Sequence, residues 1–245
     1  MPLVRTEVRD RVAIVTLDDP ARRNAVSLAL NEELITTIDE LDDRDDVGAI
    51  VITGAGRAFC AGADLGELQA ARDAEGLARI YAGFLRVAHA RLPTVAAVNG
   101  PAVGAGLNMA LACDVILAGR SARFDTRFVQ LGIHPGGGST WRLRRITDNQ
   151  TVMAMMLFGE VLDGEAAARH GVAWRCVDDD ALLDTAVTMA ARAASGTPSL
   201  LRRIKATINT LERVRDSDGA VAHELDPQVW SMQQPAFQEL VEALW

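Results

Sequence analysis

The stretch NGPAVGAGLNMALACD (residues 99–114) decides the fold, because it leads through a turn crowded with Gly100, Gly104 and Gly106 into an apolar segment. It carries no charge before its last residue, and a polar amide, Asn108, stands two residues after Gly106. A strand–turn–helix connection of this kind leaves backbone N–H groups free at the helix start. Those groups favour an anion, either a phosphate or a developing oxyanion.

Strands and helices alternate outward from this stretch. TVAAV (94–98) before the turn, DVILA (114–118) after it and VGAIVITG (47–54) are short apolar runs that predict buried strands. LVRTEV (3–8) and RVAIVTL (11–17) predict a hairpin around the polar pair between them. The alternation predicts an α/β protein in which helices pack on sheets.

Two helices are expected before the turn. The first starts at Ser27 and has one apolar face, formed by Leu30, Leu34, Ile38 and Leu41. The second is capped by Asp64 and is expected to continue as one helix until it stops before Pro93.

The character of the chain changes beyond residue 120. Residues 124–141, which include a triple glycine, are expected to form a long loop. Helices are predicted after it, at 151–158, 163–171, 181–194 and 199–214. We therefore predict an α/β core over residues 1–195 and a helical C-terminal region over 196–245.

The composition excludes several classes of function. The chain has 245 residues, 49% of them hydrophobic, and a formal net charge of −8, which disfavours binding to nucleic acid or to an anionic membrane. The uncharged stretch between Arg91 and Asp114 is long enough to cross a bilayer, but its prolines, asparagines and glycines favour a buried strand, turn and helix.

Cysteine and histidine usage points to a reducing cytoplasm and to the absence of a metal. The three cysteines, Cys60, Cys113 and Cys176, form no CxxC pair, and the N-terminal residues do not resemble a signal peptide. The four histidines form no HxxxH or HExxH motif.

Known glycine motifs do not explain the turn. The chain has no GxxxxGK[ST] loop, Met109 stands where the dinucleotide motif GxGxxG needs its last glycine, and GGSTW (137–141) fails the hydrolase motif GxSxG. A nucleotide-binding oxidoreductase is therefore disfavoured. What remains is a pair of glycine turns, FCAGADL (59–65) and the one in 99–114. They either present backbone amides to one point as an oxyanion hole or allow close packing of the backbone.

Several motifs, in one order, resemble the enoyl-CoA hydratase/isomerase family, also called the crotonases. They are RRNA (22–25), AFCAGADL (58–65), AAVNGPAVGAGLNMALACD (96–114), LGIHPGGGSTWRL (131–143) and DGEAAARHGVAWRCV (163–177). The likeness covers roughly residues 5–195. It implies a spiral of ββα units followed by a helical region that supports a homotrimer or a hexamer made of two trimers.

The resemblance also implies a ligand and a site. Family members bind acyl-CoA thioesters, so coenzyme A would enter as part of the substrate and no separate cofactor is expected. The oxyanion-hole amides would be those of Ala63 and Ala105. The residues lining the coenzyme A groove would be Arg22, Ala25, Ala61, Asp64 and Leu65.

Two departures from the family pattern bear on the reaction. Hydratases of the family use two glutamates, and their positions are taken here by Asn108 and Phe128. Neither side chain transfers a proton near neutral pH, so we expect standard hydration to be lost while the oxyanion hole is kept. Asp125, His134 and Glu67 are the residues that could replace the missing acids.

Two functions therefore stay open. The first is an acyl-CoA enzyme whose reaction is a decarboxylation, an isomerisation or a thioester hydrolysis. The second is a non-catalytic protein that binds acyl-CoA without converting it.

Overall fold

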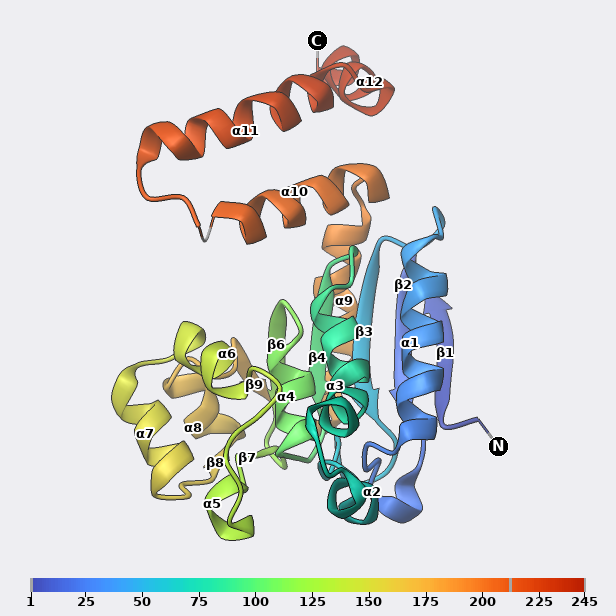
Figure 1. Ribbon diagram of the computed structural model, residues 1–245. Coiled ribbons are helices and arrows are strands. Elements are labelled where there is room, and N and C mark those ends of the chain that lie inside the picture. Colours follow the sequence, from blue (N-terminus) through green and yellow to red (C-terminus); the bar gives the residue numbers. More distant parts are fainter. Residues whose placement is uncertain (1, 212, 245) are drawn as a thin grey trace.

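A six-stranded sheet forms the centre of the protein in the computed structural model, which describes residues 2–211 and 213–244. Its strand order is β1-β2-β3-β4-β6-β9 (Figure 1). β1 pairs antiparallel with β2, and the other neighbours are parallel. The five predicted strands and the hairpin are confirmed, with the bounds β1 (Val4–Arg9), β2 (Val12–Leu17), β3 (Ala49–Gly54), β4 (Thr94–Val98) and β6 (Val115–Gly119). The sixth strand, β9 (Arg175–Val177), was not predicted.

Helices cover both faces of this sheet. α1 (Leu28–Asp42), α3 (Ala74–Ala88) and α4 (Ala105–Leu111) lie on one face, and α9 (Leu182–Ala194) lies on the other (Figure 1). The strand side chains alternate accordingly: Ile50 and Ile52 join the core under α1, whereas Val51 joins the core under α9. Burial on both faces explains why β3 reads as a continuous apolar run.

Two expected helix starts are confirmed by their caps. The Ser27 hydroxyl accepts a hydrogen bond from the Leu30 amide at 3.2 Å, and the Asp64 carboxylate accepts one from the Glu67 amide at 3.0 Å. These side chains satisfy amides that have no partner within their own helix.

The prediction of one helix from Asp64 to Pro93 is wrong. The segment forms α2 (Leu65–Ala70) and α3, and Ala71 between them has an extended backbone. Asp73 starts a new helix by accepting a hydrogen bond from the Gly76 amide at 2.8 Å. A second capping residue inside the apolar pattern therefore divides it.

The expected long loop over 124–141 is only partly a loop. A small second sheet joins β5 (Pro101–Val103), β7 (Arg123–Asp125) and β8 (Leu162–Asp163), and α5 (Phe128–Leu131) makes one turn. β7 pairs with β5, which lies about 20 residues earlier in the chain, so no local sequence pattern indicates this pairing. The remaining elements are the 3-10 turns η1 (Pro20–Arg22) and η2 (Asp179–Ala181), with α6 (Ser139–Ile146), α7 (Asn149–Leu157) and α8 (Gly164–Arg169).

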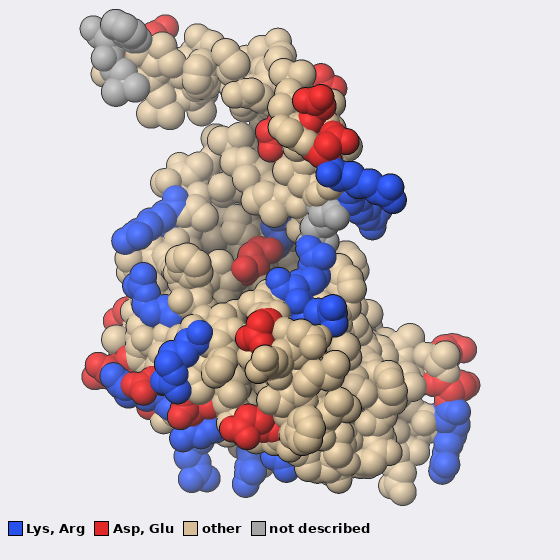
Figure 2. Space-filling view, turned by 90° about the vertical axis from the view of Figure 1, so that its left-hand side faces the viewer, with Lys and Arg blue, Asp and Glu red and all other residues tan. Residues whose placement is uncertain are grey.

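The helical C-terminal region stands beyond one end of the sheet. α10 (Pro198–Leu211), α11 (Ser217–Met232) and α12 (Pro235–Leu244) follow α9 (Figure 1), and Figure 2 shows them as a lobe projecting from the body. The predicted helix 199–214 is shorter than expected: it ends at Leu211, residue 212 lies outside the described residues, and 213–215 are not helical. No helix among the described residues has the length and apolar character needed to cross a membrane.

Candidate functional site

The two glycine turns lie against each other. Cys60 and Ala102 form a parallel bridge in which the Cys60 amide donates to the Pro101 carbonyl at 3.1 Å. A Cβ atom added at Gly106 would lie 2.1 Å from the Cys60 carbonyl oxygen, and one added at Gly62 would lie 3.0 Å from that of Val103. Glycine is therefore required here because two backbones approach closely.

The amides of Ala63 and Ala105 have no hydrogen-bond acceptor within residues 2–211 and 213–244. Ala63 forms a parallel bridge with Val26. The Val26 amide donates to the Gly62 carbonyl, and the Val26 carbonyl accepts from the Asp64 amide, so the Ala63 amide points away from Val26. Ala105 is the first residue of α4 and follows Gly104, whose φ is +50°. An amide in the first helical turn has no acceptor within its helix.

Asn108 is buried and fully engaged with other parts of the protein. Its side-chain nitrogen donates to the carbonyls of Gly136 at 3.3 Å and Gly137 at 3.1 Å. Its side-chain oxygen accepts a hydrogen bond of 2.9 Å from Arg142. The residue predicted at the first glutamate position thus contacts a loop and a cation.

Phe128, predicted at the second glutamate position, belongs to the hydrophobic core and is 9% exposed. It is the first residue of α5 and follows Arg127, whose φ is +59°. An aromatic ring in the core supplies no group that moves a proton.

The three candidate replacements for the acids differ in their surroundings. Glu67 accepts a hydrogen bond from the Leu28 amide at 2.7 Å, and His134 is exposed beside the Pro135 carbonyl at 2.7 Å. Both therefore have structural contacts. Asp125 is buried: one of its carboxylate oxygens pairs with Arg127, and the other has no hydrogen-bond partner among the described residues.

The residues expected at the coenzyme A groove lie on neighbouring segments. The Ala61 amide donates to the Arg23 carbonyl at 3.0 Å, which joins the segment 22–25 to 61–65. Arg22 pairs with Asp19 at 2.7 Å and lies 3.5 Å from Asp64, and its side chain is 50% exposed.

Ala25 and Leu65 belong to the same two segments. The amide of Ala25 donates to the Arg22 carbonyl at 3.2 Å, and the Leu65 side chain is exposed.

Sequence reasoning missed two residues that organise these turns. Asn24 is fully buried, and its side chain donates to the carbonyls of Ala55 at 2.9 Å and Ala58 at 2.8 Å. Arg142 holds Asn108 from α6. Asn24 sits within a quoted motif, and an amide next to a turn is a recognisable signal for backbone bonding.

Thiol and metal chemistry find no support. Burial raises the pKa of the Cys60 and Cys113 thiols to about 12, so neither is a nucleophile at neutral pH. No cluster of metal-ligating side chains occurs among the described residues.

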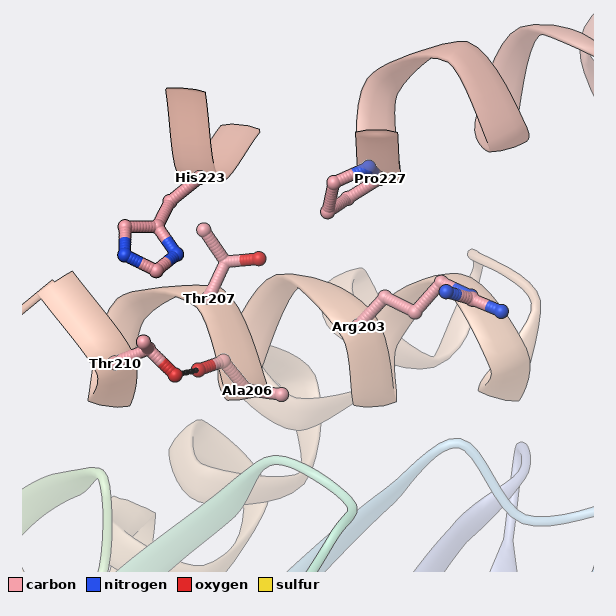
Figure 3. A pocket seen from close by; sticks show the side chains of 6 residues that line it. All are labelled: Arg203, Ala206, Thr207, Thr210, His223 and Pro227. Carbon is pink, nitrogen blue, oxygen red and sulfur yellow. Dashed lines mark hydrogen bonds between the residues drawn. The ribbon is translucent and has the colours of Figure 1, made fainter. Parts of the chain in front are cut away.

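A hollow of about 230 Å³ lies away from the glycine turns, between α10 and α11 (Figure 3). Its lining residues are Arg203, Ala206, Thr207, Thr210, His223 and Pro227. All of them come from the C-terminal helices, and none was expected at the site. The hollow is a gap between two helices with exposed surfaces, distinct from the candidate site.

The fold and the paired glycine turns define a protein of the crotonase type. A model of the enoyl-CoA hydratase/isomerase family matches residues 7–241, and the chain belongs to this family. A protein of Mycobacterium tuberculosis named "Probable enoyl-CoA hydratase EchA14" is 45% identical over 246 residues, covering 96% of this chain and 94% of the relative.

Another relative is named for a different activity, and solved structures similar to this chain are known. The 1,2-epoxyphenylacetyl-CoA isomerase of Escherichia coli is 35% identical, covering 86% of this chain and 84% of the relative. The crystal structure of an enoyl-CoA hydratase from Bacillus anthracis superposes with a TM-score of 0.92 at 28% identity, covering 99% of this chain and 95% of that one. The predicted family and the α/β crotonase-like fold are confirmed.

Proposed function

We propose that this protein binds an acyl-CoA thioester and stabilises negative charge on the thioester oxygen with the Ala63 and Ala105 amides. One observation carries the proposal: two turns in backbone contact each present an amide that has no acceptor among the described residues. Such preorganised donors typically contribute about 3–4 kcal/mol each to a transition state that develops an oxyanion. The ligand class follows from the family.

The reaction we propose is not standard hydration. Hydration needs groups that deliver and remove protons on both sides of the double bond. Asn108 is held by three contacts with the protein, and Phe128 is apolar. An isomerisation, a decarboxylation or a thioester hydrolysis places charge on the same oxygen with fewer acid and base groups. A relative named as an isomerase supports this direction.

The alternative is a protein that binds acyl-CoA without converting it. To separate the two, purified protein is offered enoyl-, dienoyl- and malonyl-type CoA thioesters, with binding measured by calorimetry and turnover by product analysis. Conversion of one thioester supports the enzyme. Tight binding without turnover on any thioester supports the alternative, and failure to bind any of them refutes both.

We also propose that the C-terminal helices assemble the protein into a homotrimer or a hexamer. Apolar side chains on these helices are exposed to solvent, including Ile208 (61% exposed), Leu225 (52%) and Leu240 (65%). Light scattering of the wild type and of Leu225→Glu tests this: the variant is expected to dissociate. A monomeric wild type would refute it.

A reducing cytoplasm stays a prediction, supported by three cysteines that are free thiols.

A further inference from the structure

We propose that Asn108 is a positioning residue: with Arg142 it holds the triple-glycine loop, residues 136–138, in place beside the start of α4. The amide at the glutamate position is then required for this contact rather than being a remnant of a lost acid. The structural part of the proposal stands by itself, and its ligand readout rests on the function proposed above.

The hydrogen bonds fix the orientation of the Asn108 amide. A guanidinium only donates and a carbonyl only accepts, so the side-chain oxygen must face Arg142 and the nitrogen must face Gly136 and Gly137. Arg142 closes the group by donating to the Gly137 carbonyl at 2.7 Å. An amide satisfies all of these contacts at once. A carboxylate would keep the hydrogen bond from Arg142 and lose the two donations to the carbonyls of Gly136 and Gly137.

The loop has no side chain of its own with which to anchor itself. A Cβ atom at Gly136 would lie 2.2 Å from the Tyr81 hydroxyl oxygen, and one at Gly137 would lie 2.4 Å from the ring of Phe84. The loop backbone is thus pressed against two side chains of α3. Gly137 also has a φ of +62°, a region that favours glycine. Polar contacts to the loop carbonyls must therefore hold it.

Arg142 depends on this contact as much as the loop does. Four described Arg and Lys residues are not exposed: Arg86, Arg142, Arg202 and Lys205. Of these four, only Arg142 has no carboxylate of a described residue within 4.0 Å, and burial lowers its pKa. Burying a cation without a counter-charge is costly unless polar groups solvate it. Here the Asn108 oxygen and the Gly137 carbonyl do so.

The test compares this pair with a matched pair nearby. Asn108→Leu and Arg142→Met remove the polar groups at similar size, and Asn108→Asp keeps only the acceptor. The controls are Asn149→Leu and Arg144→Met. Arg144 lies on α6, like Arg142, and donates to Asn149 of α7 at 3.0 Å on the exposed surface. Hydrogen exchange reports on the loop through the Ser139 amide, which donates to the Gly136 carbonyl at 3.2 Å.

We expect each of the first two variants to lower protection of the Ser139 amide about tenfold or more, because each loses hydrogen bonds that involve the charged guanidinium. The double variant Asn108→Leu/Arg142→Met should lose little more than either single one, because the two residues form one network. Asn108→Asp should lie in between, and the controls should leave the loop unchanged.

The second readout is the affinity for butyryl-CoA relative to that for coenzyme A. A displaced loop should weaken butyryl-CoA binding about tenfold and leave coenzyme A binding unchanged, whereas a general loss of stability would not change that ratio. Unchanged protection of Ser139 in Asn108→Leu, or additive losses in the double variant, overturns the inference. Wild-type protein that binds neither ligand refutes the proposed function and leaves the exchange result to decide the inference.

Discussion

The side-chain oxygen of Asn108 accepts a hydrogen bond of 2.9 Å from Arg142, across 34 positions of the sequence. This contact, with the two donations to the loop, uses both polar atoms of the amide. The position at which the resemblance to the family's hydratases predicts a proton-transferring glutamate is therefore occupied by a group with a structural contact at each polar atom. An amide in these contacts transfers no proton near neutral pH.

The first prediction is that crotonyl-CoA hydration cannot be restored at this position alone. Each missing acid or base typically lowers the rate by about 10²–10⁴. We expect wild type and Asn108→Glu both to be slower by at least that factor than a hydratase carrying both glutamates, because Phe128 still occupies the second position. Loss of the enoyl-thioester absorbance measures the rate. Efficient hydration by the wild type would show that another acid, with Asp125 the first to test, has taken over.

The second prediction concerns the Ala105 amide. Ala105→Pro removes the N–H at the first helical position, where proline is tolerated and no existing hydrogen bond is lost. On whichever thioester is converted, kcat/KM should fall about 10²–10³-fold while coenzyme A affinity stays unchanged. Ala74→Pro, at the first position of α3, is the control and should be neutral. Equal losses in turnover and coenzyme A affinity would argue against an oxyanion role.

The third prediction compares two glycines of the same turn. Gly106→Ala places a Cβ atom 2.1 Å from the Cys60 carbonyl oxygen, so backbone must move and we expect a loss of about 3 kcal/mol. Gly104→Ala meets nothing closer than 3.9 Å, and its cost, about 1–3 kcal/mol, comes from the backbone conformation alone (φ +50°, ψ −110°), which L side chains rarely adopt. Urea unfolding midpoints give both values. A reversed order would mean that the two turns are not in contact.

The fourth prediction uses the buried thiols. Cys60 and Cys113 have pKa values raised to about 12 by burial, against 9.0 for the ordinary thiol. A raised folded-state pKa favours the folded form fully below pH 9, and that contribution declines as pH rises from about 9 toward 12. At pH 8 a thiol reagent should reach only the partly buried Cys176 in native protein and all three cysteines in urea. Rapid labelling of Cys60 in the native state would contradict this.

The main sheet and its caps could be predicted because their signals are local. The β-branched run of β3 and the capping side chains of Ser27 and Asp64 act within a few residues. The division of α2 from α3 was missed because the apolar spacing continues across it, although Asp73 is itself a capping signal. Apolar spacing alone therefore overestimates the length of a helix that contains a second cap.

The candidate site was predictable only where the family motif fixes it. The motifs predicted that the two glycine turns meet, and the bridge from Cys60 to Ala102 confirms it. The partner of Asn108 was not predictable, because Arg142 gives no sign in the sequence of which residue it will contact. Its one signal is its place: a charged residue soon after the triple glycine, next to the buried Leu143.

The last prediction concerns how the C-terminal lobe is attached. Lys205 of α10 is the single lysine of the chain, and its side chain is 11% exposed. Its ammonium lies 2.7 Å from the Asp114 carboxylate and donates to the Leu92 carbonyl at 2.9 Å. Asp114 is 36% exposed and keeps its hydrogen bonds from Thr94, so the pair is only partly shielded, and Lys205→Met should lower the free energy of unfolding by about 1–2 kcal/mol.

Arg203→Met is the matched control on the same helix. The Arg203 guanidinium lies 4.0 Å from the centre of the Trp230 ring, within the C-terminal lobe itself. If Lys205 anchors the lobe, limited proteolysis should cut the connection near Gly196 faster in Lys205→Met than in Arg203→Met, because only the first contact joins α10 to the sheet. Equal cleavage rates in the two variants would show that the anchor lies elsewhere, with Arg202 and its bond to the Asp42 carbonyl the next contact to remove.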